Sequence, residues 1–122
     1  MEACPEGWHL PSLDEWDTLI TYVGGEEVAG SLLKSLSGWT QNGNGTDEYY
    51  FAVLPGGYKS QSTYYAGGDR AYFWSSTEQS SNKAYIVAFY FDDDYIDYGS
   101  DDKNERESVR CVKDNVPFRP RL

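Results

Sequence analysis

The chain has 122 residues, which is the size of one domain and enough to bury a hydrophobic core. Its formal net charge of −10 argues against nucleic acid and anionic membranes as partners, because both bind clustered Lys and Arg. We find no signal peptide, lipobox or transmembrane run in this segment, so we expect no direct membrane insertion by it. Because Met1 lies so close to Cys4, we expect a domain cut from a longer precursor.

The first predicted element is a helix over residues 13–23. Ser12 is a suitable N-cap, and Glu15 completes an S-x-x-E capping box. A Gly-Gly pair at 24–25 follows as the stop signal. Apolar residues recur on one face of this helix, at Leu13, Trp16, Leu19, Ile20 and Val23. His9 precedes the cap without a second ligand-type residue at metal spacing, so we expect a packed or capping histidine rather than a catalytic base.

A second helix is predicted over residues 26–36, where apolar residues again fall at helical spacing. Residues 39–48 follow as a loop with two Asn-Gly pairs that accept positive φ. Residues 59–70 are rich in Ser, Tyr and Gly and are predicted as another loop.

Eleven Tyr, five Phe and four Trp tilt the composition toward β structure. The run at 84–91 is apolar on both alternating faces, which is typical of a central strand covered on both sides. Residues 115–122 are interrupted by proline, and we predict an extended tail there. The five predicted strands cover residues 49–54, 71–77, 84–91, 95–98 and 108–112.

The two cysteines, Cys4 and Cys111, lie near opposite ends of the chain and outside any CxxC motif or Cys/His cluster. Their spacing does not fit a zinc site. If they pair, the disulfide closes nearly the whole chain into a loop, stabilises the fold by about 4–5 kcal/mol in the chain-entropy model, and indicates an oxidising compartment. The alternative is two buried free thiols in a cytosolic domain.

Residues 84–102 combine tyrosines and aspartates without any Lys or Arg, a composition typical of a recognition surface. Tyr offers a large contact area, and Asp accepts hydrogen bonds from Lys, Arg or sugar hydroxyls. We predict that Phe89 and Ile96 anchor this surface from below. The predicted ligand-binding residues are Tyr90, Asp92, Asp93, Asp94, Tyr95, Asp97, Tyr98, Ser100, Asp101 and Asp102. The alternative is a solvated acidic hairpin.

Four blocks of the sequence resemble, in the same order, the Fibrobacter succinogenes major paralogous domain family: CPEGWHLPS with EW in residues 4–16, FAVLPGGY at 51–58, FWSSTE at 73–78 and SVRCVKD at 108–114. Parts of these blocks are similar, more distantly, to formylglycine-generating-enzyme-like domains. The resemblance implies a single α+β domain over residues 1–114. Its fold would be C-type-lectin-like, with two short N-terminal helices, a twisted antiparallel sheet and adjacent termini. This arrangement agrees with a bridge between Cys4 and Cys111.

Members of this family look like secreted or surface domains, often lipoproteins, which implies an extracellular or bacterial cell-surface location, or a phage particle. Some domains of this kind serve as variable proteins of diversity-generating retroelements, in which adenine-directed changes alter the exposed residues. Residues 84–102 contain no Lys, Gln, Glu, Met or Trp, and every residue there has a codon ending in a pyrimidine, as randomised Asn codons would.

We therefore expect a non-enzymatic ligand-binding domain whose partner is a protein or glycan on another cell or surface. No nucleophile stands beside a base in a readable motif, and no cofactor is expected. The alternative is calcium-dependent carbohydrate binding by a set of four carboxylates, Asp92, Asp93, Asp94 and Asp97. However, consecutive aspartates on a strand point to opposite faces, and the Glu-Pro-Asn and Trp-Asn-Asp motifs of calcium-dependent lectins are absent.

Overall fold

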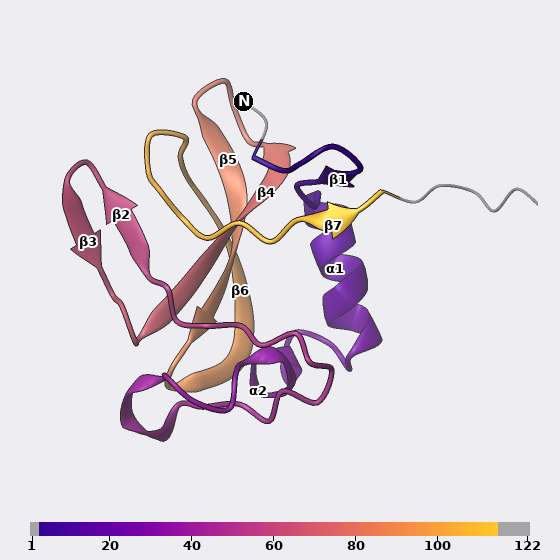
Figure 1. Cartoon of the computed structure of the whole chain (residues 1–122), viewed down its shortest axis with the longest axis vertical. Helices are drawn as coiled ribbons and strands as arrows, with labels where there is room; N and C mark the ends of the chain where they lie inside the picture. The colour runs from indigo at the N-terminus through magenta and orange to yellow at the C-terminus, as the bar shows by residue number, and fades with distance from the viewer. Residues whose placement is uncertain (1–2, 115–122) are drawn as a thin grey trace, which may run out of the picture.

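The computed structural model describes residues 3–114 of the chain (Figure 1). Its helices are α1 (Leu13–Tyr22), α2 (Ala29–Leu33) and the 3-10 helix η1 (Thr40–Asn42). Its strands are β1 (Trp8–His9), β2 (Tyr58–Ser60), β3 (Thr63–Tyr65), β4 (Arg70–Glu78), β5 (Lys83–Tyr90), β6 (Asp93–Asp102) and β7 (Val112–Lys113). Within these residues the strands form three antiparallel sheets: β1 pairs with β7, β2 pairs with β3, and the largest sheet has the order β4-β5-β6.

The α+β, C-type-lectin-like arrangement expected from the resemblance is wrong. Strands dominate the described residues, since α1 and α2 have only 10 and 5 residues, whereas β4, β5 and β6 have 9, 8 and 10. The strands also divide into three small sheets instead of one twisted sheet. The physical reason lies in the distribution of residues: the aromatic and apolar runs are concentrated between β4 and β6, and Gly and Pro cut the flanking segments into short pieces. The predicted tail at 115–122 lies outside the described residues.

The first predicted helix is confirmed as α1, including its capping box. The Ser12 hydroxyl accepts from the Glu15 backbone N–H at 3.1 Å, and the Ser12 N–H donates to the Glu15 carboxylate at 3.0 Å. The predicted apolar face is buried at Trp16 and Ile20. The Trp16 ring packs 5.5 Å, centroid to centroid, from the Phe73 ring of β4. α1 therefore covers one side of the large sheet.

The second predicted helix is much shorter than expected, because α2 ends before Lys34. Lys34 instead forms an isolated parallel bridge with Val53, and the Ser35 N–H donates to the Val53 carbonyl at 2.9 Å. The predicted strand at 49–54 is reduced to this bridge. The chain leaves the helix because the extended backbone here gains partners from a segment that is distant in sequence.

Two of the predicted loops contain more structure than expected. The loop at 59–70 holds most of the β2–β3 hairpin. In the loop at 39–48, Gly43 has φ −74, and it is Asn42 that takes the positive φ of 61. A side chain at Gly43 would collide with the carbonyl of Phe91, the residue directly after β5. Glycine is required at this position for close packing rather than for a left-handed backbone.

β5 is the central strand of the large sheet, as predicted, and it pairs with β4 on one side and β6 on the other. Phe73, Val87 and Tyr98 lie opposite one another across the three strands, and they share a face with the buried Phe89 and Ile96. This face packs against Trp16. Together with the α1 contacts, these residues form the hydrophobic core of the domain.

The segments near the two ends of the described chain are joined twice. Cys4 and Cys111 form a disulfide with an S–S distance of 2.06 Å, which confirms the bridge. Beside it, Trp8 and His9 pair with Lys113 and Val112 in the β1–β7 sheet. The predicted strand at 108–112 is shorter than expected, because Ser108 makes only an isolated bridge to Phe73 before β7 begins. None of the helices in the described range has the length and apolar character needed to cross a membrane.

Candidate binding surface

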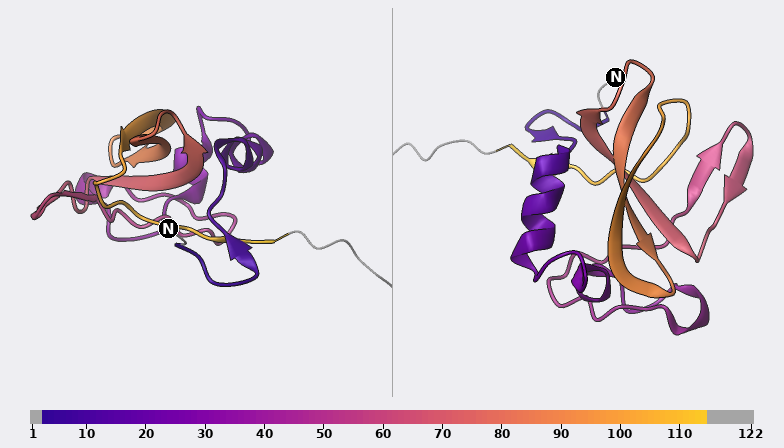
Figure 2. Two further views of the ribbon diagram at one scale, coloured as in Figure 1. Left: turned by 90° about the horizontal axis from the view of Figure 1, so that it is seen from above. Right: turned by 180° about the vertical axis from the view of Figure 1, so that it is seen from behind.

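The large sheet has a second, outer face that points away from α1. Tyr72, Ala88 and Asp97 are paired across its three strands, and Arg70 is paired with Tyr90. Because residues paired across antiparallel strands share a face, these side chains lie opposite the core face. The β2–β3 hairpin stands on this side and α1 on the other (Figure 2).

A stack of three tyrosines joins the hairpin to the outer face. The Tyr58 ring lies 5.2 Å from that of Tyr65 at 22° and 5.1 Å from that of Tyr72 at 21°. Arg70 extends the stack: its Nη1 donates to the Tyr72 hydroxyl at 2.8 Å, and its guanidinium carbon lies 5.5 Å from the Tyr90 ring centroid. Aromatic rings, a guanidinium and several hydroxyls are thus held in one array.

Tyr90 and Asp97 are the two predicted binding residues that join this array. Burial raises the pKa of the Tyr90 hydroxyl to about 12, and Tyr72 and Asp97 nearby add to the effect. The Tyr90 hydroxyl is therefore neutral at physiological pH, and as a donor it faces the Asp97 carboxylate. Asp97 is exposed and offers the carboxylate of the array.

The other two predicted tyrosines point toward the helical side. Tyr98 packs against the core, and its hydroxyl donates to Asp17 of α1 at 3.1 Å. The Tyr95 hydroxyl donates to Glu26, between the two helices, at 3.0 Å. Burial is the main cause that raises the pKa of Tyr98, and the hydrogen bond to Asp17 is the second. These two side chains connect β6 to the helices and are not displayed beside Tyr90.

The acidic turn at Asp92, Asp93 and Asp94 is exposed and rests on a lysine that sequence reasoning did not single out. Lys34 is only 2% exposed, and its ammonium donates to the backbone carbonyls of Tyr90 at 3.0 Å and Asp93 at 3.4 Å. Burial lowers the pKa of Lys34, whereas the charges of the three aspartates oppose this change. The lysine holds the β5–β6 turn closed from beneath.

The remaining predicted residues lie at the far end of β6, away from this turn. Ser100 donates to the Gln79 side chain at 3.1 Å, and Asp102 pairs with Lys83 in the sheet. Asp92, Asp93, Asp94 and Asp97 are not gathered into a common metal site. Among residues 3–114, the group of acidic side chains close enough to share an ion consists of Asp101, Glu105 and Glu107.

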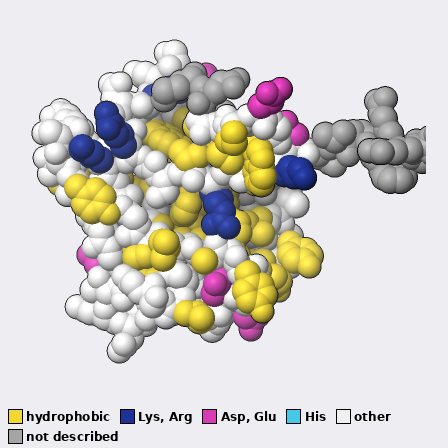
Figure 3. All heavy atoms as spheres, in the orientation of Figure 1, with side chains coloured by type: hydrophobic (Ala, Val, Ile, Leu, Met, Phe, Trp, Pro, Cys, Tyr) yellow, Lys and Arg dark blue, Asp and Glu magenta, His cyan; other side chains and the backbone are white. Residues whose placement is uncertain are grey.

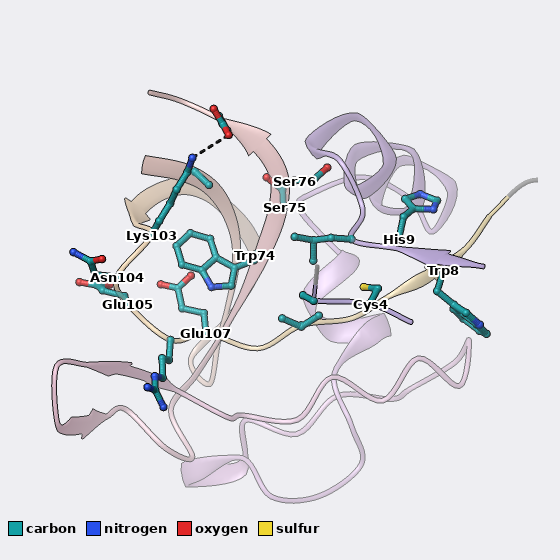
Figure 4. A pocket seen from close by; sticks show the side chains of 16 residues that line it. Cys4, Trp8, His9, Trp74, Ser75, Ser76, Lys103, Asn104, Glu105 and Glu107 are labelled. Atoms are coloured by element: carbon teal, nitrogen blue, oxygen red, sulfur yellow. Dashed lines mark ion pairs between the residues drawn. The ribbon is translucent and has the colours of Figure 1, made fainter. Parts of the chain in front are cut away.

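A groove of about 1010 Å³ opens at this end of the sheet, between β4, the N-terminal segment and residues 103–109 (Figure 4). The Trp74 indole lies beside Glu107 in it, and Lys103 pairs with Glu78 at 3.0 Å. Both carboxylate oxygens of Glu107 are buried and have no hydrogen-bond partner. Burial raises the pKa of Glu107 to about 10, and its neighbours Asp101 and Glu105 contribute. At neutral pH the Glu107 carboxyl group is therefore protonated, and as a neutral acid it can donate to Asp101.

His9 ties the start of α1 to the C-terminal part of the fold. Its Nδ1 lies 2.7 Å from the Asp114 carboxylate, and its Nε2 lies 2.8 Å from that of Glu15. The hydrogen bonds to Glu15 and Asp114 raise the pKa of His9. With both ring nitrogens engaged by carboxylates, the imidazole acts as a cationic link within the scaffold.

The family is identified by comparison with known domains. The model of the Fibrobacter succinogenes major domain matches residues 1–113. The chain belongs to this family. Searches of curated proteins and of solved structures gave no match. The match spans Cys4, Cys111 and every predicted surface residue, so the scaffold and the outer face both belong to the Fibrobacter succinogenes major domain.

The side of this Fibrobacter succinogenes major domain that faces the viewer in Figure 1 shows scattered apolar and aromatic side chains and few carboxylates (Figure 3). Arg110 is used within the scaffold. The Arg110 guanidinium lies 4.0 Å from the Phe51 ring centroid and donates to the Phe51 carbonyl at 2.6 Å. The ordered array of aromatic, cationic and acidic groups lies instead on the outer face.

Proposed function

We propose that this domain is a non-enzymatic recognition module that binds a protein or glycan on another cell or surface. Its binding face is the outer face of the β4-β5-β6 sheet together with the β2–β3 hairpin. The residues that carry the contact are Tyr58, Tyr65, Tyr72, Tyr90, Arg70 and Asp97.

The observation that carries this proposal is the stack of tyrosines. Each ring in it already rests on a neighbour, so ligand binding freezes few side-chain rotations. Tyr and Arg are also the residue types that contribute most at protein interfaces. Tyr65 is 44% exposed at the open end of the stack and offers a ring for further stacking.

The disulfide supports an extracellular or bacterial cell-surface location, or a phage particle, because such bonds persist in oxidising compartments. We further propose that residues 84–102 are the diversified segment of a retroelement variable protein. Val87, Phe89 and Ile96 are core residues, so tolerated variation would fall on exposed positions such as Asp97. A near-copy of the coding segment that differs only at adenines, next to a reverse-transcriptase gene, would support this proposal; its absence would contradict it.

The binding face is tested by mutation at its open edge. The purified, disulfide-bonded chain is applied to a printed glycan array and to an array of bacterial surface proteins. Tyr65→Ala and Arg70→Ala should each weaken any binding at least about tenfold, because each removes one of the side chains that contact the ligand. Tyr22→Ala, a residue 76% exposed at the end of α1, is the matched control and should leave binding unchanged. Binding that survives both outer-face substitutions, or no binding on either array, would contradict the proposal.

A further inference from the structure

The β2–β3 hairpin carries a row of side chains that the tyrosine stack does not use. Within the hairpin, Tyr58 pairs with Tyr65, and Lys59 pairs with Tyr64. Because successive residues of a strand point to opposite faces, Lys59 and Tyr64 lie on the face opposite the stack. Lys59 also exchanges two backbone hydrogen bonds of 2.7 Å with Arg106, so Arg106 extends the row. Tyr64, Lys59 and Arg106 therefore lie side by side across three backbone segments.

The two cations in this row are not neutralised by the domain itself. Among residues 3–114, neither Lys59 nor Arg106 forms an ion pair. Glu105 and Glu107 flank Arg106 in sequence, but their carboxyl groups gather with that of Asp101 of β6 instead. Like charges opposite each other on paired strands repel, so this arrangement is unfavourable until an anion joins it. The pair of cations thus points to an anionic ligand.

The hairpin also differs in charge from the rest of the chain. The formal net charge is −10, yet residues 49–68 contain no Asp or Glu. Basic side chains gather over the β2–β3 hairpin in Figure 3, without carboxylates among them. A protein with a large negative net charge repels densely charged polyanions such as nucleic acid. This local pair of cations therefore fits a ligand whose anionic group is isolated.

Tyr64 supplies an aromatic surface beside the cations. It is 59% exposed, and its hydroxyl donates to the Gly56 carbonyl. A side chain at Gly67 would collide with the Tyr64 ring, so the ring rests directly on the backbone there. A ring that is already fixed loses little rotational freedom when a ligand packs on it. The C–H face of a sugar ring packs on such an aromatic surface.

We propose that Tyr64, Lys59 and Arg106 bind an acidic sugar, which is a pyranose ring that carries a carboxylate or sulfate group. The sugar ring packs on Tyr64, and the anionic group accepts hydrogen bonds from the ammonium of Lys59 and the guanidinium of Arg106. The site lies on the face of the hairpin opposite Tyr58 and Tyr65, so it can fail while the proposed function holds.

The test is NMR titration of the disulfide-bonded chain with sialyllactose, with sulfated lactose and with uncharged lactose. We expect a dissociation constant of about 1 mM for the acidic sugars, at least about tenfold tighter than for lactose. The two acidic sugars decide which anionic group binds more tightly. Arg106→Gln and Tyr64→Ala should each weaken binding at least about fivefold, because they remove a charged donor and the stacking surface. Lys83→Gln removes an equal charge from the start of β5 and is the matched control, which should leave the affinity unchanged.

Three results would overturn the proposal: equal affinity for lactose and the acidic sugars, binding that survives Arg106→Gln, or tighter binding of oligodeoxythymidine, which would indicate a nucleic-acid site. The NMR spectrum of each variant verifies that it is folded. If Tyr64→Ala does not fold, Arg106→Gln decides the question, because Arg106 pairs with Lys59 through the backbone and its side chain is exposed.

Discussion

The two ends of β6 carry acidic residues in opposite environments. At its start, Asp92, Asp93 and Asp94 are exposed, and the buried ammonium of Lys34 lies beneath their turn. At its far end, the Glu107 carboxylate is buried beside Asp101, with no cation paired to it among residues 3–114. The comparison teaches that the density of aspartates along a strand does not set the charge of each carboxyl group. That charge depends on whether solvent or a fixed counter-charge stabilises the ionised form.

The largest expected effect comes from removing the counter-charge at the first end. Lys34→Met keeps an unbranched side chain of similar volume but leaves the carbonyls of Tyr90 and Asp93 without their donor. We expect the free energy of unfolding to fall by about 3 kcal/mol, because hydrogen bonds to a charged group are strong and buried carbonyls need partners. Urea denaturation measures this value.

Lys103→Met is the matched control for this variant. Lys103 pairs with Glu78 on the surface, where ion pairs contribute little, so the change should stay within about 0.5 kcal/mol. If Lys34→Met costs no more than Lys103→Met, the buried ammonium does not hold the turn.

A smaller effect of opposite sign is expected at the other end of β6. At neutral pH, Glu107→Gln should raise the free energy of unfolding by about 1–3 kcal/mol, because the buried Glu107 must take up a proton when the chain folds, whereas an amide is neutral and can donate to Asp101. Asp93→Asn at the solvated end should change it by less than about 0.5 kcal/mol. Urea denaturation of both variants gives the comparison. Equal effects would mean that the two acidic ends have similar environments after all.

His9 provides the smallest test, since here two carboxylates share a cation that can lose its charge. Its pKa is raised above 6.5, so its stabilising contribution is complete below about pH 6.5 and is lost as the pH rises through the raised value. The stability difference between the wild type and His9→Gln should therefore shrink from about pH 6 to about pH 9. His9 is the one histidine of the chain, so no other imidazole titrates in this range. A difference that grows with pH would contradict the link.

The parts of the fold that the sequence predicts are those with local signals. α1 follows from the Ser12–Glu15 capping box and a 3.6-residue apolar period, and β4 and β5 follow from continuous aromatic and apolar runs. The short α2 and the β2–β3 hairpin depend on partners far along the chain. Val53 draws Lys34 out of the helix, and Tyr72 supports the hairpin through Tyr58. No local pattern contains those contacts, so the C-type-lectin-like expectation failed.

For the candidate site, composition located the region but not the direction of each side chain. Tyr90 and Asp97 lie on the outer face, but Tyr98 follows Asp97 directly and therefore points to the helices. The bulge between Ala88 and Tyr90 shifts the register and is not encoded by any recognisable residue pattern. Glu105 and Glu107 lie outside the tyrosine-rich stretch, and only the pairing of Arg106 with Lys59 brings them back to Asp101.

The disulfide between Cys4 and Cys111 has a mechanical consequence. A tension applied to the chain outside these two residues passes directly from one sulfur to the other. The outer face of β4-β5-β6 lies in the closed loop between them, away from the β1–β7 pair that shares this load. A ligand held by this face would pull on the sheet, whereas tension along the chain would leave the binding face undistorted.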